Sequence, residues 1–183
     1  MLRTKIFNEI SNIKKIGLKI QKLNEILSQA PNNIKALEEL GTIYHYSGQD
    51  IEAIDIYEKL KKLEPKNIDI RGFLGYLYYE INNLEKAIDE FNFILDIAPD
   101  SPFVSFLLGN AYSRAGLVVD AVNAYEFAIF LDFDMYSAHL DFAKKYEDMG
   151  RINRALKEYK AAYEIDVKDK KILEKIKTLE GMK

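Results

Sequence analysis

The sequence predicts an all-α protein, a right-handed solenoid of antiparallel helix pairs that ends in a C-terminal capping helix. Two observations support this fold class: a pattern that returns every 34 residues, and the helical spacing of apolar residues inside each period. The pattern is clearest from Leu74-Gly75, which is followed by Tyr78, Ala87 and Pro99. A fixed period of this length is typical of stacked arrays, in which each repeat packs only against its neighbours.

This period gives four full repeats, which are 34–67, 68–101, 102–135 and 136–169. Each repeat contains two stretches of about a dozen residues in which apolar side chains recur every three or four positions, as on one face of a helix. In the first repeat, Leu37, Leu40 and Tyr44 share a face of the first helix, while Ala53 and Leu60 mark the second. We therefore expect one helix pair in each repeat.

The turn between the two helices of a repeat contains a residue that accepts a left-handed backbone conformation. Glycine stands there in three repeats, as Gly48, Gly116 and Gly150, and asparagine stands there in the second repeat, as Asn82. Glycine commonly ends helices in this conformation, and asparagine is the next most tolerant residue. We expect the first helix of each pair to end at this turn.

Small residues in the first helix of each repeat are expected to let it lie close against the second helix. They are Gly41, Gly75, Gly109 and Ala143, and they are matched in the second helix by Ala53, Ala87, Ala121 and Ala155. One aromatic residue per repeat is expected to fill the space between successive pairs, and these are Tyr57, Phe91, Tyr125 and Tyr159. Aromatic residues at this regular spacing predict core packing rather than a cofactor site.

Two flanking segments complete the expected domain. Residues 1–33 are expected to form a degenerate N-terminal helical unit, because Pro31 has the phase of a repeat end. The apolar spacing fits two helices broken near Gly17, which we favour, or one long helix, since glycine costs only about 1 kcal/mol inside a helix. Residues 170–183 carry apolar residues such as Ile176 among lysines, and they predict the amphipathic capping helix that arrays need.

These features resemble the tetratricopeptide repeat family over residues 34–169. The family's marks are a Leu-Gly pair, a Tyr three residues later, an Ala in the second helix, an aromatic residue four positions on, and a closing Pro. The first two repeats keep all of them, through Pro65 and Pro99, whereas Phe133 and Val167 replace the proline in the last two. The resemblance implies the solenoid described above and a protein-binding role.

No group of residues in the sequence leads us to expect catalysis, and we predict that the protein is not an enzyme. It has no cysteine, and its two histidines, His45 and His139, stand far apart in the chain. It has neither a phosphate-binding glycine loop nor a nucleophile turn. We expect no cofactor and no metal site.

Charge and hydropathy limit the classes of partner. The formal net charge is −3, with basic ends on an acidic body. Nucleic-acid binding needs Lys and Arg clustered on one face, so we expect no nucleic-acid partner. No segment reaches the roughly 18 apolar residues of a membrane helix, so we expect no direct membrane insertion and a cytoplasmic location.

A protein or peptide partner is expected on the inner wall of the array. In an arrangement like the family's, the first helices line a concave groove whose middle is aromatic here. The residues expected to hold an apolar peptide or helix are His45, Tyr46, Phe73, Tyr76, Tyr79, Phe103, Phe106, Asn110 and Arg114, and aromatic residues of this kind dominate binding hot spots. The alternative is that Phe73, Phe103 and Phe106 pack between helices or are covered by the N-terminal segment.

A second aromatic surface is expected on the second helices. Phe93 and Phe127 share a repeat position that is usually polar in the family, and Phe130 lies one turn beyond Phe127. Self-association into a homo-oligomer through a stripe of these three residues is a hypothesis. Its alternative is local packing against Phe133 or a neighbouring helix.

The function that we predict is protein–protein interaction, by an adaptor or assembly scaffold that holds a partner peptide or helix in the aromatic groove. The alternative is a chaperone for secreted or membrane-associated client proteins, which would use the same groove. The two differ in what they bind. An adaptor holds a folded, stoichiometric partner, whereas a chaperone holds an unfolded client that aggregates when released.

Overall fold

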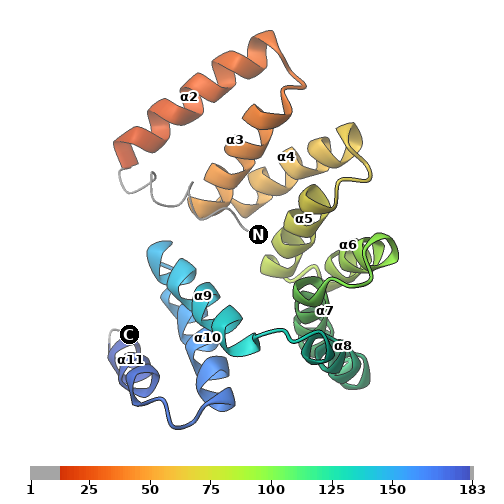
Figure 1. Cartoon of the computed structure of the whole chain (residues 1–183). Coiled ribbons are helices and arrows are strands. Elements are labelled where there is room, and N and C mark those ends of the chain that lie inside the picture. The colour runs from red at the N-terminus through yellow and green to blue at the C-terminus, as the bar shows by residue number, and fades with distance from the viewer. Residues whose placement is uncertain (1–12, 182–183) are drawn as a thin grey trace. The chain divides into compact units, whose positions relative to one another are not determined.

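The structure, a computed structural model, describes residues 13–181, and among these residues there are helices and no strands (Figure 1). The ten helices of this range are α2 (Ile13–Gln29), α3 (Ile34–Tyr46), α4 (Asp50–Leu63), α5 (Ile68–Glu80), α6 (Leu84–Ile97), α7 (Pro102–Ala115), α8 (Val118–Phe130), α9 (Met135–Asp148), α10 (Ile152–Ile165) and α11 (Lys170–Glu180). Contacts pair α3 with α4, α5 with α6 and α9 with α10. The predicted all-α fold class is confirmed.

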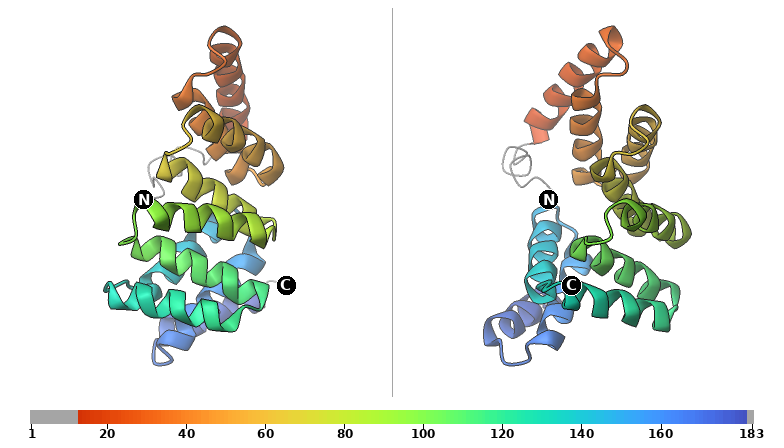
Figure 2. Two further views of the ribbon diagram at one scale, coloured as in Figure 1. Left: turned by 90° about the vertical axis from the view of Figure 1, so that its right-hand side faces the viewer. Right: turned by 45° about the vertical axis from the view of Figure 1, so that its right-hand side comes forward.

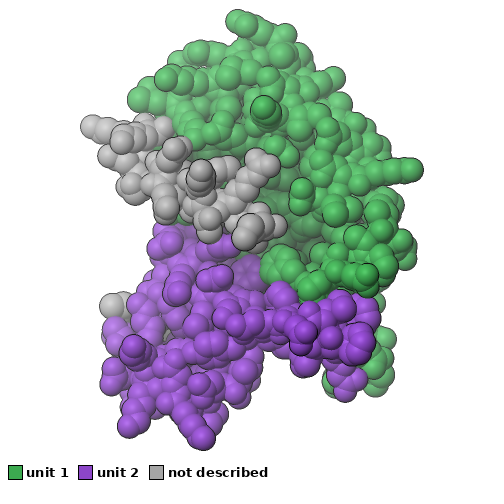
Figure 3. Space-filling view, viewed as in Figure 1, with its two compact units in different colours: residues 1–124 green, residues 125–183 purple. Residues whose placement is uncertain are grey.

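The chain divides into two compact units, the N-terminal unit (residues 1–124) and the C-terminal unit (residues 125–183), with the boundary inside α8 (Figure 3). In the N-terminal unit, each helix from α2 to α6 contacts the next one along the chain, and α5 also contacts α7. The first helices α3, α5 and α7 follow one another on one side, and α4 and α6 lie on the other (Figures 1 and 2). In the C-terminal unit, α10 contacts both α9 and α11.

Asparagine and aspartate side chains fix where several first helices begin. Asn33, Asn67, Asp134 and Asp169 precede α3, α5, α9 and α11, and each side-chain oxygen accepts a hydrogen bond from a backbone N–H of the first turn. The N–H of Ala36, for example, donates to Asn33 Oδ1 at 3.1 Å. Caps of this kind stabilise a helix by about 1 kcal/mol each. The helices α3, α5 and α11 begin at the same position of the 34-residue period, and α9 begins one residue earlier.

The predicted turn residues adopt the expected backbone conformation. The φ angles are 83° at Gly48, 64° at Asn82, 78° at Gly116 and 69° at Gly150. All four lie in the left-handed region, which glycine enters freely and asparagine tolerates. The prediction that Asn82 replaces glycine in this slot is therefore confirmed.

Close approach within a pair depends on glycine facing an aromatic ring. A Cβ atom at Gly41 would lie 2.7 Å from the Tyr57 ring, and one at Gly75 would lie 2.8 Å from the Phe91 ring. The sequence predicted that these glycines would be matched by alanines of the second helix, but the nearest side chains are the rings. Phe91 is fully buried, so the periodic aromatic residue is part of the core, as predicted.

The helix α2 runs without interruption through Gly17, so the expected break near this glycine is wrong. Leu23 on α2 is buried against Leu40 and Ile43 of α3. This continuous apolar contact offsets the small helix penalty of one glycine, which is about 1 kcal/mol. The rest of the predicted N-terminal helical unit, residues 1–12, lies outside the described residues.

The C-terminal unit ends in α11, where the sequence predicts an amphipathic helix. Ile172, Ile176 and Leu179 are buried, and α11 packs against α10. Across the α9–α10 pair, His139 Nδ1 lies 2.8 Å from Glu158 Oε2. His139 is thus a packed and hydrogen-bonded side chain of this unit.

Candidate protein-binding site

The predicted groove residues all lie on the row of first helices in the N-terminal unit. The helix α3 contributes His45 and Tyr46, α5 contributes Phe73, Tyr76 and Tyr79, and α7 contributes Phe103, Phe106, Asn110 and Arg114. Spacings of three or four residues place side chains on one face of a helix. The first helices of three repeats, α3, α5 and α7, therefore carry these aromatic residues.

A buried histidine connects α3 to α5 at the start of this row. The His45 ring meets the Phe73 and Tyr76 rings edge-on, with centroid distances of 5.6 and 5.5 Å. Its Nδ1 atom lies 2.7 Å from Asp50 Oδ1 at the start of α4. On the other side of Phe73, the Tyr57 ring lies 4.5 Å away. These contacts hold Phe73 in a fixed position between two repeats.

The nine residues differ in how much of them is exposed. His45, Tyr76 and Phe106 are buried, with exposed fractions of 2%, 6% and 0%. Half-buried are Tyr46, Phe73, Tyr79, Phe103 and Asn110, and Arg114 is exposed. The three buried side chains support the helices, and the other six are those that a partner could touch.

Arg114 is held over one of the half-buried rings. Its guanidinium carbon lies 3.7 Å from the centroid of the Tyr79 ring, and Nη1 donates a hydrogen bond to the Tyr79 carbonyl oxygen at 2.8 Å. A guanidinium has five N–H donors in a fixed fork. Arg114 can therefore offer a carboxylate or a carbonyl oxygen a positioned donor beside an aromatic surface.

A charged network, which sequence reasoning missed, joins the first two repeats. The Glu90 carboxylate on α6 accepts from Lys61 Nζ of α4 at 2.9 Å and from Arg71 Nη1 of α5 at 2.6 Å. Lys61 also bonds Glu58, which accepts from the Tyr78 hydroxyl. Because the network spans three helices, it fixes α5, and hence its aromatic residues, relative to α4 and α6.

The pKa values of Glu58 and Lys61 in this network are shifted in the direction that favours the charged form of each side chain. Burial alone would raise the pKa of Glu58, but hydrogen bonds from Tyr78 and Lys61 outweigh it and lower that pKa. Burial likewise opposes the charge on Lys61, and the hydrogen bonds to Glu90 and Glu58 outweigh it and raise its pKa. Both groups are therefore ionised near neutral pH.

The predicted self-association residues have different surroundings. Phe93 is half-buried, and the Arg71 guanidinium carbon lies 3.5 Å from the centroid of its ring. Phe127 and Phe130 on α8 stack with a centroid distance of 6.4 Å, and both are exposed. Phe93 therefore has a cation–π partner in its own unit, and the two residues on α8 form a separate pair.

Other kinds of site have little support in the described part of the chain. No group of three His, Asp or Glu residues there could hold a metal ion. No helix of the described range is long and apolar enough to span a membrane. A surface hollow at the α4–α5 turn is lined by Glu64, Pro65, Lys66 and Asn67, and it contains none of the predicted groove residues.

Several protein families are built from helix pairs, and a match to a family model shows which of them this chain resembles. Residues 47–106, from the end of the first repeat's first helix into the third repeat, match the family model described as tetratricopeptide repeat. Residues 47–106 of this chain are similar to tetratricopeptide repeats. The predicted resemblance is confirmed, and repeats of this kind are generally non-enzymatic interaction modules.

Solved structures of tetratricopeptide repeat proteins have the same fold. A crystal structure of MamA is 26% identical, with a TM-score of 0.62, and the match covers 83% of this chain and 89% of MamA. MamA from Desulfovibrio magneticus RS-1 is 18% identical, with a TM-score of 0.64 and coverage of 91% and 96%. TTC0263, a thermophilic TPR protein in Thermus thermophilus, is 18% identical, with a TM-score of 0.60 and coverage of 96% and 95%.

A search of curated proteins finds no match to this chain. The tetratricopeptide repeats and their structural relatives together support a protein–protein interaction scaffold.

Proposed function

We propose that the protein is a non-enzymatic adaptor or assembly scaffold that binds an apolar peptide or helix of a partner on the aromatic row of α3, α5 and α7. The observation that carries this proposal is the set of half-buried rings on α3, α5 and α7, with Phe73, Tyr79 and Phe103 among them. Aromatic side chains bury 150–250 Å² each and supply much of the energy of interfaces. Covering the exposed parts of several rings would contribute to the binding free energy.

The aromatic residues of α3, α5 and α7 are held in place by contacts with neighbouring side chains, and this favours binding. The His45–Asp50 bond and the Tyr57–Phe73 contact fix the first part of the row. Arg114 fixes Tyr79 in the same way at the next repeat. A surface that is already ordered loses less conformational entropy when the partner binds.

The proposed partner segment is apolar along most of its length and carries one hydrogen-bond acceptor. The rings provide the apolar contact, and Arg114, with Asn110 on the same helix, provides donors for a carboxylate or for backbone carbonyl oxygens. An amphipathic helix or an extended peptide with one acidic residue meets these requirements.

The test is affinity capture from an extract of the source cells, followed by mass spectrometry, with the wild type and a Tyr79→Ala/Phe103→Ala variant. These two residues are half-buried, so their truncation changes the binding surface more than the core. Phe106 is fully buried and Tyr76 nearly so, and substitution of either would unfold the array and obscure the result. The matched control is Ile51→Ala/Ile97→Ala, which truncates two exposed apolar side chains on α4 and α6.

We expect the wild type and the control to retain the same partner and the Tyr79→Ala/Phe103→Ala variant to lose it, with unchanged circular dichroism in all three. One stoichiometric partner supports the adaptor, and a mixture of unfolded proteins supports the chaperone alternative. If all three proteins retain identical partners, the aromatic row is not the binding site.

A further inference from the structure

Arg114 of α7 is held in two ways by Tyr79 of α5. Its guanidinium carbon lies 3.7 Å from the centroid of the Tyr79 ring, and its Nη1 donates a hydrogen bond to the Tyr79 carbonyl oxygen at 2.8 Å. At such a short distance the guanidinium lies over the face of the ring, as arginines commonly do. Both residues belong to the N-terminal unit, so these contacts do not involve the C-terminal unit.

The contact with Tyr79 leaves one edge of the guanidinium for a ligand. Nη1 is used by the Tyr79 carbonyl oxygen, and another edge carries the N–H groups of Nε and Nη2 side by side. Two parallel N–H donors match the two oxygens of a carboxylate, whereas a carbonyl oxygen matches only one of them. Within residues 13–181, no carboxylate forms an ion pair with Arg114. The Nε–Nη2 edge therefore suits a carboxylate that this part of the chain does not supply.

A second arginine of the same unit shows how such a guanidinium is completed. Arg71 also lies over a ring, with its guanidinium carbon 3.5 Å from the centroid of Phe93. Its Nε donates to the Pro65 carbonyl oxygen at 2.6 Å, and its Nη1 donates to Glu90 Oε2 at 2.6 Å. Both arginines therefore contact a ring and a main-chain carbonyl oxygen, but in the described part of the chain only Arg71 of the two has a carboxylate as well.

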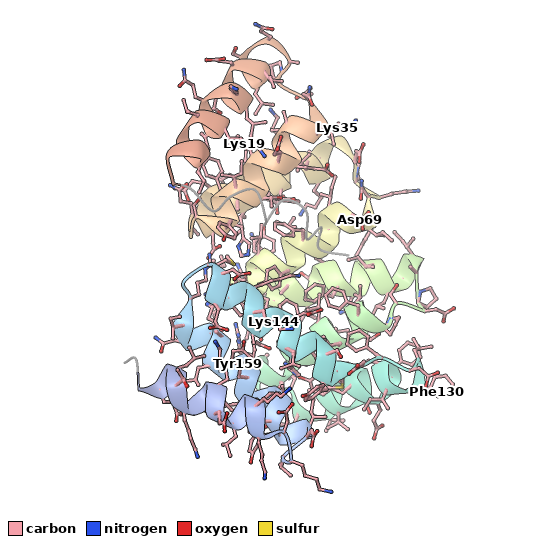
Figure 4. The ribbon with its side chains drawn as sticks, turned by 60° about the vertical axis from the view of Figure 1, so that its left-hand side comes forward. Lys19, Lys35, Asp69, Phe130, Lys144 and Tyr159 are labelled. Atoms are coloured by element: carbon pink, nitrogen blue, oxygen red, sulfur yellow. The ribbon has the colours of Figure 1, made fainter. Side chains whose placement is uncertain are left out.

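Neither acidic residue of α5 fills the Nε–Nη2 edge of Arg114. Asp69 lies in the first turn of α5, as Figure 4 shows. Tyr79 lies in the last turn, so about 15 Å of helix separates the two residues. Glu80 follows Tyr79 and is buried. The carboxylate for this edge is therefore not on the helix that holds Arg114 in place.

We propose, building on the function proposed above, that Arg114 binds the side-chain carboxylate of an aspartate or glutamate in the partner segment. Tyr79 is half-buried, and it both offers apolar surface to the partner and supports Arg114. The acidic residue of the partner then lies next to the residue that covers Tyr79. The aromatic row is thereby specific for apolar segments that carry an acidic residue at one fixed position.

Arg114 suits this task because its side chain is already held in place. The ring contact and the hydrogen bond to α5 restrict it before the partner arrives, so binding has little left to order. A lysine ammonium has the same charge but lacks the fork of parallel N–H donors. We therefore expect Arg114→Lys to lose most of the preference for an acidic partner residue, and an unchanged preference would contradict two-pronged binding.

The test uses the full chain and a library of random twelve-residue peptides displayed on phage. A fixed linker follows each peptide, so that a carboxylate can come only from an Asp or Glu side chain. We expect the wild type to enrich apolar peptides that share one acidic residue at a fixed place, and Arg114→Gln to enrich apolar peptides without it. Arg114 is exposed, so its circular dichroism should be that of the wild type. The matched control is Lys62→Gln, which removes an exposed positive charge from α4 and should enrich the same peptides as the wild type.

Affinities for one enriched peptide separate carboxylate binding from mere support of Tyr79. Fluorescence polarisation compares this peptide with a form in which its acidic residue is changed to the amide. With the wild type, the amide form should bind about tenfold more weakly. With Arg114→Gln, both forms should bind alike, and as well as the amide form binds the wild type. If Arg114 only held Tyr79 in place, Arg114→Gln would weaken both forms by the same factor, and that result would overturn the proposal.

Three results of the selection would also overturn it, and they differ in what they say about the aromatic row. Apolar peptides without a fixed acidic residue would leave the proposed function standing and remove the role of Arg114. Enrichment that depends on a free C-terminal end, seen in a second library without the linker, would make a terminal carboxylate the ligand. If the wild type enriches no peptide from either library, the aromatic row is not a peptide-binding site, and the proposed function is wrong as well.

Discussion

Two helical glycines, Gly75 and Gly17, differ in what surrounds them. A Cβ atom at Gly75 would lie 2.8 Å from the Phe91 ring, whereas one at Gly17 would have no neighbour within 4 Å. Gly75→Ala should therefore destabilise the fold by about 1–3 kcal/mol through overpacking. Gly17→Ala should stabilise it by up to about 1 kcal/mol, because alanine favours the helix. Urea denaturation measures both free energies of unfolding, and equal effects at the two sites would refute this packing argument.

Some of these residue-scale features could be predicted from the sequence because they depend on the backbone alone. A left-handed turn needs glycine or asparagine whatever lies around it, so Asn82 could be recognised from its position in the repeat. The neighbour of Gly75 depends on how two helices rotate against each other. The sequence showed that close approach occurs there, but it pointed to alanine rather than the Phe91 ring.

At the scale of elements, the Glu90 network holds α4, α5 and α6 together. Glu90→Gln should lower the free energy of unfolding by about 2 kcal/mol, because it leaves Arg71 without its charged acceptor and Lys61 with Glu58 alone, next to a nearly buried side chain. The matched control is Glu85→Gln on the same helix, where the side chain is exposed and little change is expected. Denaturant unfolding of both variants would contradict the role of the network if their stabilities were equal.

This network could not be read from the sequence. Lys61, Arg71 and Glu90 are far apart in the chain and stand on three different helices. In the sequence they look like other charged residues of amphipathic helices, since only the packing of successive repeats brings them together. The helices themselves were predictable, because apolar spacing is a local signal.

At the scale of the whole chain, periodicity predicted the all-helical fold and the succession of short helices from α3 to α10. It did not predict that the compact units would divide inside α8, because the same period runs through both. For the candidate site, it placed nine residues on one row of helices but could not separate the supporting side chains, such as Phe106, from the half-buried ones, such as Phe103. The exposure of a side chain depends on the helices packed around it. For the same reason, the sequence did not show that Phe93 is half-buried and Phe130 is exposed.

The central claim is that a partner binds the aromatic row of α3, α5 and α7, and site-specific photo-cross-linking tests it most directly. A photoreactive phenylalanine analogue would replace Tyr79 in one variant and Ile51, which is exposed on α4, in another. We predict that the analogue at position 79 cross-links a single protein in the source cells and that the analogue at position 51 does not. Cross-linking of the same partner from position 51 but not from position 79 would contradict the claim.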